Sequence, residues 1–241
     1  MRLAVISDIH GNWDALSAVL EDIDRSRVDD VVCLGDNIGY GPEPNRVIET
    51  LLENNIPSIL GNHEQAVIEP EHLSWFNPMA RKSLIKIIGW LSDNSRAYIS
   101  QLNFVRIAHN CRFVHGFPPD SATRYYFEAS ETDRRRVFET IKERLCFIGH
   151  THDLHIIYYD GHTLGADIVP DRRLQLSDHI RYIISVGSVG QPRDGDNNAK
   201  YVIWDTSEDA IEVKYVAYDI ASVAKKIIDA DLPRSHADRL W

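Results

Sequence analysis

Five short segments of this chain place aspartate, histidine and asparagine side chains directly after apolar runs. In chain order they are Asp8-Ile9-His10, Gly35-Asp36, Gly61-Asn62-His63-Glu64, His115-Gly116 and Gly149-His150-Thr151-His152. Carboxylate, amide and imidazole donors suit Mn²⁺, Fe or Zn²⁺ rather than a zinc site built from thiolates. Any one segment alone is more often a solvated loop, but all five, in order and each after an apolar run, favour a metal site.

The spacing within two of these segments indicates paired ligands. Side chains two residues apart on an extended backbone project to the same side, so Asp8 and His10 can reach one place, as can His150 and His152. A glycine beside such a pair lets the backbone and a metal ion approach closely. Each pair would then offer two ligands to one position.

The apolar runs before these segments have the pattern of buried strands. Three short runs rich in Val, Ile and Leu cover residues 2–6, 30–34 and 56–60. Between them, apolar residues fall at helical spacing from Trp13 to Ile23 and from Val47 to Leu52, the second stretch beginning at Pro44. This alternation favours parallel strands in an open α/β sheet, where ligands bind at the carboxyl ends of strands.

The rest of the chain is mainly helical first and strand-rich later. Residues 66–102 read as helical, and Ser130 to Asp133 open a further helix with a variant of the capping box. The later expected elements are strands at 112–114, 145–148, 155–159, 182–186, 201–204 and 211–217, then a helix at 220–230. No linker or repeat interrupts the chain, so we expect a single domain over residues 1–241.

Composition and charge exclude several classes of protein. The 241 residues carry 26 Lys+Arg and 36 Asp+Glu, a formal charge of −10, which argues against long nucleic acid and membrane surfaces as partners. No apolar run is long enough to span a bilayer or to serve as a signal peptide. The three cysteines lack metal-type spacing and read as buried free thiols, so we expect a cytoplasmic protein. The oligomeric state is not encoded in any readable pattern.

In this order the five segments resemble the signature of the calcineurin-like metallophosphoesterases. The run from Gly187 to Gly195, and the later Tyr218-Asp219-Ile220 and Asp231-Leu232-Pro233, are similar to segments of the small bacterial and archaeal branch of that family. The resemblance covers nearly the whole chain, least securely residues 66–102 and 163–181. It implies an α/β fold, a four-layer α/β/β/α sandwich with two mixed sheets and a two-metal site.

The resemblance also implies a role for each residue of the five segments. Asp8, His10 and His152 would hold one divalent metal, and Asn62, His115 and His150 would hold the second, with Asp36 bridging both. His63 would be the catalytic acid. The metals are expected to be two divalent ions per chain, with Mn²⁺ favoured and Fe, Zn, Ni or Co as alternatives.

The chemistry expected of such a site is hydrolysis of phosphomonoesters or phosphodiesters by a hydroxide that bridges the two metals. A shared carboxylate such as Asp36 would be needed to hold two cations that repel each other. The substrate would be a small-molecule or protein-borne phosphoester. The alternative is a non-catalytic metal-binding or protein-interaction scaffold on the same fold, which would be expected to have lost ligand positions.

Three residue assignments have competing interpretations. His109 also follows apolar residues and competes with His115 for the isolated ligand position, although the apolar run before His115 and the glycine after it favour His115. His63 could orient a ligand instead of donating a proton. Arg193 lies in a Gly-rich loop and could clamp a substrate phosphate in a bidentate manner, or be a solvated loop residue.

Overall fold

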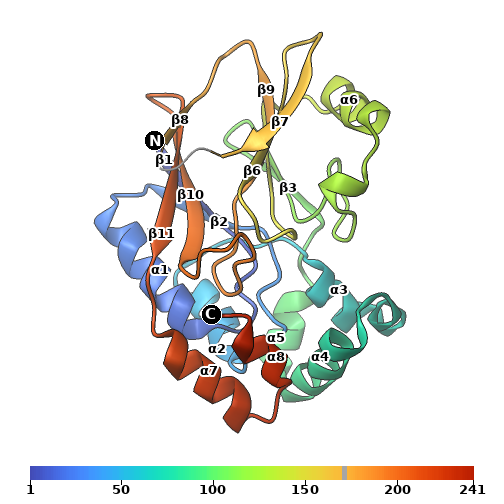
Figure 1. Cartoon of the computed structure of the whole chain (residues 1–241), viewed down its shortest axis with the longest axis vertical. Coiled ribbons are helices and arrows are strands. Elements are labelled where there is room, and N and C mark those ends of the chain that lie inside the picture. The colour runs from blue at the N-terminus through green and yellow to red at the C-terminus, as the bar shows by residue number, and fades with distance from the viewer. Residues whose placement is uncertain (170–172) are drawn as a thin grey trace.

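The computed structural model describes residues 1–169 and 173–241, whose strands form two sheets packed face to face (Figure 1). The first sheet has the strand order β2-β1-β10-β11-β8, and the second has the order β3-β4-β5-β9-β6-β7. The first sheet comprises β1 (Arg2–Ile6), β2 (Asp30–Cys33), β8 (Arg173–Gln175), β10 (Ala199–Asp205) and β11 (Ala210–Val216). The second comprises β3 (Val105–Ala108), β4 (Cys111–Val114), β5 (Leu145–Ile148), β6 (His155–Tyr159), β7 (Leu164–Ile168) and β9 (Arg181–Ser185).

Helices cover the outer face of each sheet. Residues of α1 and α2 pack on the first sheet, and residues of α6 pack on the second, which gives the predicted four layers α/β/β/α. The helices are α1 (Trp13–Arg25), α2 (Pro44–Glu53), α3 (Asn62–Ile68), α4 (Pro78–Trp90), α5 (Asp93–Ile99), α6 (Glu131–Thr140), α7 (Ile220–Asp229) and α8 (Arg234–Asp238). In the described part of the chain, no helix is long and apolar enough to cross a membrane.

Alternation along the strands explains why both faces of each sheet are buried. In β1, Leu3 and Val5 point into the core between the sheets, whereas Ala4 and Ile6 point toward α1 and α2. This is the two-residue period of a strand, applied to a sequence that is apolar at every position. Phe113 of β4 likewise faces the core between the sheets, while the next residue, Val114, faces α6.

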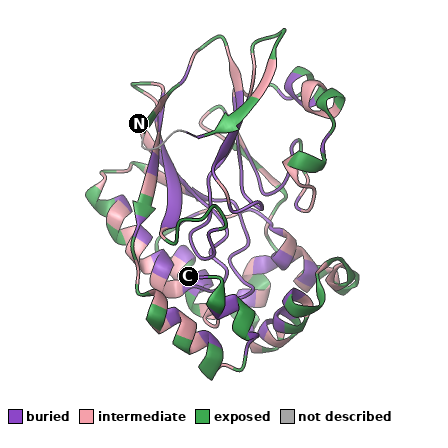
Figure 2. Cartoon of the chain, viewed as in Figure 1, coloured by how far each residue is buried: buried purple, intermediate pink, exposed green. Residues whose placement is uncertain are grey.

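The sheets are mixed, as the resemblance implied, and not wholly parallel. β1 pairs with β2 in parallel and with β10 antiparallel, while β4, β5 and β9 run parallel to one another. Four of the five polar segments follow the parallel strands β1, β2, β4 and β5, and the remaining segment, Gly61 to Glu64, follows an isolated bridge at Ser58. Figure 2 shows that the loops after these strands are buried where the two sheets meet the helices at the bottom of the view.

The structure corrects several element boundaries. The expected strand at 56–60 reduces to a single parallel bridge between Ser58 and Cys33, because Pro57 has no N–H to extend the ladder and Leu60 donates its N–H to Asn103 instead. The turn before β4 falls at His109 and Asn110, so Cys111 begins the strand. Sequence patterns did not reveal β7, β8 or α8, which are only three to five residues long.

Candidate metal centre

The loops after the parallel strands bring six acidic and imidazole side chains together in two groups. The first cluster contains Asp8, His10, Asp36 and His152, and a second group contains Asp36, His115 and His150. In each, the candidate ligand atoms lie within 4.8 Å of one another. All six residues are buried, the most exposed being His150 at 5%. The structure thus gathers residues that are as far apart in the chain as Asp8 and His152.

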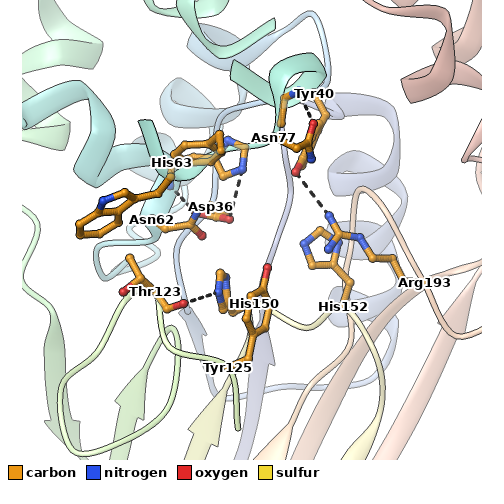
Figure 3. A pocket seen from close by; sticks show the side chains of 13 residues that line it. Asp36, Tyr40, Asn62, His63, Asn77, Thr123, Tyr125, His150, His152 and Arg193 are labelled. Atoms are coloured by element: carbon orange, nitrogen blue, oxygen red, sulfur yellow. Dashed lines mark hydrogen bonds and ion pairs between the residues drawn. The ribbon is translucent and has the colours of Figure 1, made fainter. Parts of the chain in front are cut away.

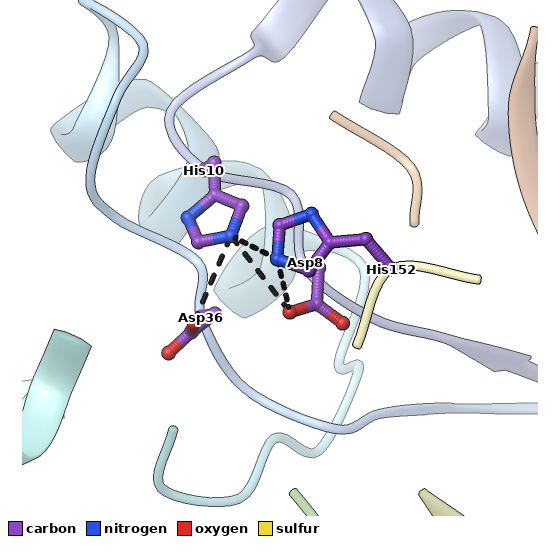
Figure 4. Close-up of side chains that lie close together, drawn as sticks. All are labelled: Asp8, His10, Asp36 and His152. Atoms are coloured by element: carbon purple, nitrogen blue, oxygen red, sulfur yellow. Dashed lines mark hydrogen bonds and ion pairs between the residues drawn. The ribbon is translucent and has the colours of Figure 1, made fainter. Parts of the chain in front are cut away.

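Two imidazole nitrogens face each other in the first cluster (Figure 4). The Nδ1 atoms of His10 and His152 lie 3.0 Å and 2.6 Å from the carbonyl oxygens of Ile38 and Gln191. A carbonyl oxygen can only accept, so these partners assign the proton of each neutral ring to Nδ1 and leave a lone pair on Nε2. The two Nε2 atoms are 3.1 Å apart. Lone pairs directed at one another at this distance fit a shared cation.

Asp8 adds a buried negative charge to the same place. Its Oδ1 atom lies 3.2 Å from Nε2 of His152 and 3.7 Å from Nε2 of His10, and it accepts no hydrogen bond from the residues that the structure describes. The other carboxylate oxygen accepts the backbone N–H of His150 at 3.1 Å. A buried carboxylate oxygen without a donor is costly, and a cation between these atoms removes the cost.

The second group has a similar arrangement with one neutral oxygen. Nδ1 of His115 donates to the carbonyl of Leu34 at 2.8 Å, and its Nε2 lies 3.2 Å from Oδ1 of Asn62. Nε2 of His150 donates to the carbonyl of Thr123 at 3.0 Å, which leaves Nδ1 as the coordinating atom. With Asn62 included, the second cluster is Asp36, Asn62, His115 and His150, the set that the resemblance assigned to one metal.

Asp36 belongs to both clusters through one oxygen atom. Its Oδ2 lies 3.7 Å from Nε2 of His10 and 3.4 Å from Nε2 of His115, while Oδ1 accepts the backbone N–H of His63 at 3.0 Å. Burial alone would raise the pKa of Asp36, but the surrounding histidines, His115 and His63 foremost, hold it well below the usual range. The carboxylate is therefore ionised and available to both positions.

The pKa of His115 indicates how strongly the second cluster attracts positive charge. Burial lowers this pKa, but the neighbouring Asp36 carboxylate outweighs burial and raises it to about 9. A proton on Nε2 supplies the positive charge that Asp36 attracts. A metal ion at the same position supplies that charge instead, because coordination requires the unprotonated nitrogen.

Five of the clustered residues have an unusual backbone conformation. Asp8, His10, Asp36, His150 and His152 have φ between 52° and 69°, in the left-handed region. The expectation that Asp8 and His10 project together from an extended segment is therefore wrong in its reason, although the two side chains do converge. For His150 and His152 the expected convergence itself is wrong, since the two side chains reach different clusters. Such conformations cost about 1–3 kcal/mol each and concentrate at functional sites.

Neighbouring loops hold the strained backbone in place. The N–H groups of Val189 and Gly190 donate to the carbonyls of Ser7 and Asp8, each at 3.0 Å, and Ser188 donates its hydroxyl to Asp8 at 2.9 Å. A Cβ atom at Gly190 would lie 1.8 Å from the carbonyl oxygen of Ile9. The glycine of this loop is thus required by the close approach of two backbones.

Glu64 is a supporting residue that the sequence reasoning did not single out. Its buried carboxylate accepts the backbone N–H groups of Asp36, Asn37 and Gly61 at 2.9, 2.7 and 3.0 Å. Burial, followed by the charge of Asp36, raises the pKa of Glu64 to about 7. Its place next to His63 in the Gly-Asn-His-Glu segment was a signal that could have identified it.

A cavity of about 310 Å³, the inner cavity, lies over the two clusters (Figure 3). Its wall includes His63 and Arg193, together with aromatic and polar side chains that sequence reasoning left unassigned. These are Tyr40, Trp75, Phe76, Asn77, Thr123 and Tyr125. Most come from residues 66–102 and 118–126.

His63 and Arg193 lie at the cavity in different electrostatic settings. Nε2 of His63 is 3.8 Å from Oδ2 of Asp36, and its buried Nδ1 has no hydrogen-bond partner in the described part of the chain. Burial lowers the pKa of His63 to about 4, against the opposing influence of Asp36, so the ring is neutral at pH 7. Arg193 is exposed, and its Nη2 lies 3.5 Å from the Tyr40 hydroxyl.

The competition between His109 and His115 is resolved by position. Nε2 of His109 lies 2.7 Å from a carboxylate oxygen of Asp30, in the turn before β4. His115 lies directly after β4 and contacts Asp36 and Asn62. The structure therefore brings His115, and not His109, to the clustered residues.

Comparison with known proteins yields matches over most or all of the chain. A family model described as calcineurin-like phosphoesterase matches residues 1–185. An uncharacterized protein of Methanocaldococcus jannaschii is 33% identical over 244 residues, covering 99% of this chain and 97% of the relative. The crystal structure of a metallophosphoesterase from Sphaerobacter thermophilus superposes with a TM-score of 0.84 at 35% identity, covering 100% of this chain and 98% of that one. A hypothetical protein from Pyrococcus horikoshii shares the fold, with a TM-score of 0.76 at 20% identity and coverage of 100% and 97%.

Proposed function

This chain belongs to the calcineurin-like phosphoesterase family, and we propose that it hydrolyses phosphoesters with two divalent ions held by the two clusters. The observation that carries the proposal is the shared carboxylate oxygen of Asp36, which lies between Nε2 of His10 and Nε2 of His115. Two cations placed close together repel each other, and a common anion between them reduces that repulsion.

The donor atoms of the chain fit divalent ions of intermediate hardness. Asp8, His10 and His152 would hold one ion, Asn62, His115 and His150 the other, and Asp36 both. Oxygen and imidazole ligands without thiolate suit Mn²⁺, and Fe, Zn, Ni or Co can occupy the same set. When bound, such ions activate water for attack on phosphorus and neutralise phosphoryl oxygens.

The remaining site residues act on the substrate directly. His63 would donate a proton to the leaving oxygen, and because burial lowers its pKa to about 4, the negative charge of a bound phosphate is needed to raise that pKa first. Arg193 would bind a phosphoryl oxygen at the rim of the inner cavity. Hydrolysis then proceeds in one displacement, without a covalent intermediate on the chain.

The inner cavity supports a small-molecule substrate or a phosphorylated side chain. Its volume of about 310 Å³ accommodates a phosphate and part of its leaving group. The formal charge of −10 disfavours long nucleic acids, because an acidic surface repels an extended polyanion.

Metal analysis and a phosphatase assay on the same preparation test the proposal. The protein would be stripped of metal, reconstituted with Mn²⁺, and assayed on aryl phosphate mono- and diesters. We expect about two ions per chain and activity that requires them. Activity without metal would contradict the mechanism, and two bound ions with no hydrolysis of any phosphoester would favour the alternative scaffold.

A further inference from the structure

A second cavity, the outer chamber, adjoins the inner cavity and shares part of its wall. The volume of the outer chamber is about 600 Å³. Tyr40, Asn77, Tyr125 and Arg193 line both spaces, and Figure 3 labels all four. A molecule whose phosphate is bound over the clusters can therefore extend past these side chains into the outer chamber.

Two arginines line the outer chamber, and neither has a carboxylate partner among the residues that the structure describes. Arg193 comes from the loop after β9, and Arg239 follows helix α8. Within the described part of the chain, no carboxylate oxygen lies within 4.0 Å of either guanidinium group. The guanidinium group of Arg193 lies 3.5 Å from the Tyr40 hydroxyl and 3.4 Å from Gln191 Oε1, both at the long limit for hydrogen bonds, and 5.9 Å from the centre of the Tyr40 ring.

The acidic residues near these arginines are engaged elsewhere. Asp196 lines the chamber, but its Oδ1 lies 3.3 Å from the ammonium group of Lys200, which is itself fully buried. The same ammonium group lies 2.8 Å from Oδ1 of Asp194. With Arg193 and Arg239 included, the formal charge of these five groups is +1. Among the side chains that line the chamber, Arg193 and Arg239 are cationic and Asp196 is anionic, on a chain whose formal charge is −10.

Guanidinium groups that are exposed, that line one cavity and that form no ion pair with the described residues suit one class of ligand group. Their planar donor pairs match the oxygens of a phosphate better than those of a neutral polar group. Trp241 also lines the chamber, and 66% of its surface is exposed, so a flat apolar face is available beside the arginines.

We propose that the outer chamber binds a second phosphate group, carried by the leaving group of the substrate. The preferred substrates are then organic bisphosphates, in which one phosphate lies over the metal clusters, the other contacts Arg239, and Arg193 lies at the wall that the two cavities share. In the hydrolysis, the oxygen of one water molecule bonds to the phosphorus of the first phosphate, the ester P–O bond breaks, and the leaving oxygen takes a proton. Inorganic phosphate is released together with an alcohol that keeps the second phosphate. This inference rests on the proposed function, since it assumes that hydrolysis takes place over the two clusters.

A matched pair of nucleotides isolates the second phosphate. Adenosine 3′-monophosphate and adenosine 3′,5′-bisphosphate contain the same 3′ ester, and chromatography of the products reports cleavage of that ester in each. We expect kcat/KM to be about tenfold or more higher for the bisphosphate, because charge-assisted hydrogen bonds to one phosphate contribute at least that factor. The variant Arg239→Ala should remove most of this preference.

Arg234→Ala is the matched control. Arg234 lies on α8 near Arg239, contacts Asp238 at 3.5 Å and does not line the chamber. The control should keep the preference of the unmodified protein. Equal kcat/KM values for the two nucleotides in the unmodified protein, or a preference that survives Arg239→Ala, would overturn the inference.

Equilibrium binding separates this inference from the proposed function. Adenosine 5′-monophosphate would be titrated calorimetrically into the metal-stripped protein and its Arg239→Ala variant. We expect binding about fivefold or more weaker in the variant, and equal affinity would overturn the inference. A protein that binds this probe through Arg239 but hydrolyses no phosphoester with Mn²⁺ would contradict the proposed function alone.

Discussion

The two clusters that share Asp36 have the same number of donors but different charges. The first cluster contains the carboxylate of Asp8, whereas the second has the neutral amide oxygen of Asn62 in the corresponding role. Each also contains two imidazoles with assigned lone pairs. The difference indicates that the first cluster attracts a divalent ion more strongly, because an added negative charge in a buried site is worth more than a dipole.

Replacement of Asp36 should damage both clusters at once, because they share its carboxylate. In Asp36→Ala, we expect metal content to fall from about two ions per chain to one or fewer, and kcat to fall about 10³-fold or more. Elemental analysis and an aryl phosphatase assay measure the two effects. Asp30→Ala is the control, since Asp30 pairs with His109 outside the clusters and should keep both ions. Full activity in Asp36→Ala would be incompatible with a shared ligand.

Single replacements in each cluster should reveal their unequal charge. We expect Asp8→Asn to weaken the tighter metal-binding step about 10²-fold or more, because a carboxylate facing a divalent ion is lost. We expect Asn62→Ala to weaken the other step by only about tenfold. Calorimetric titration of Mn²⁺ into the stripped protein measures both steps. Equal losses in the two variants would show that charge does not distinguish the clusters.

Replacement of His63 tests whether a residue of the cavity wall can be removed without loss of metal from the clusters. In His63→Ala, both clusters are intact, so we expect two bound ions and a fall in kcat of about 10²-fold or more. The loss should be larger for alkyl phosphates, whose leaving oxygens need a proton, than for p-nitrophenyl phosphate. Loss of metal together with activity would instead make His63 a structural residue.

Replacement of Glu64 tests how much the hydrogen bonds that its carboxylate accepts from backbone N–H groups near the clusters stabilise the protein. In Glu64→Gln, one oxygen can no longer accept N–H groups, so we expect a loss of about 1–3 kcal/mol in the free energy of unfolding of the metal-free protein. Denaturant unfolding measures it. Glu69→Gln, at the end of the same helix, is the control and should change this free energy little. Unchanged stability in Glu64→Gln would mean that solvent replaces the carboxylate.

The smallest expected effect comes from a buried histidine outside both clusters. Burial lowers the pKa of His236 from 6.5 to about 4, so between these values the unfolded chain binds a proton that the folded chain does not. The contribution of His236 to stability is therefore present above pH 6.5 and lost as the pH falls toward 4. In His236→Gln, the melting temperature of the metal-free protein should depend less on pH in this window. An unchanged dependence would assign the acid sensitivity to the clusters.

Prediction from the sequence succeeded where chemistry and strand ends coincide. Asp8, Asp36 and His115 lie within three residues of the ends of β1, β2 and β4, so the location of each strand indicated where these side chains gather. The four layers followed from the family resemblance, because residue patterns alone favoured an open sheet. The mixed strand directions depend on β10, whose pairing with β1 joins residues about 200 positions apart.

Other features were not readable because they depend on long-range contacts. The strained φ angles of His150 and His152 are held by the rest of the structure, and local preference alone favoured an extended segment. The outer chamber depends on Arg239 and Trp241, which follow a five-residue helix that has no distinct periodicity. Pro57 was a readable signal against the strand at 56–60, and apolar composition outweighed it in the prediction.

Each cluster draws its residues from both sheets of the sandwich. Asp8, His10 and Asp36 follow strands of the first sheet, whereas His115, His150 and His152 follow strands of the second. An ion in either cluster would therefore cross-link the two sheets. Sliding of one sheet over the other would have to break coordinate bonds as well as side-chain packing. Bound metal would therefore increase the mechanical resistance of the sandwich to this motion.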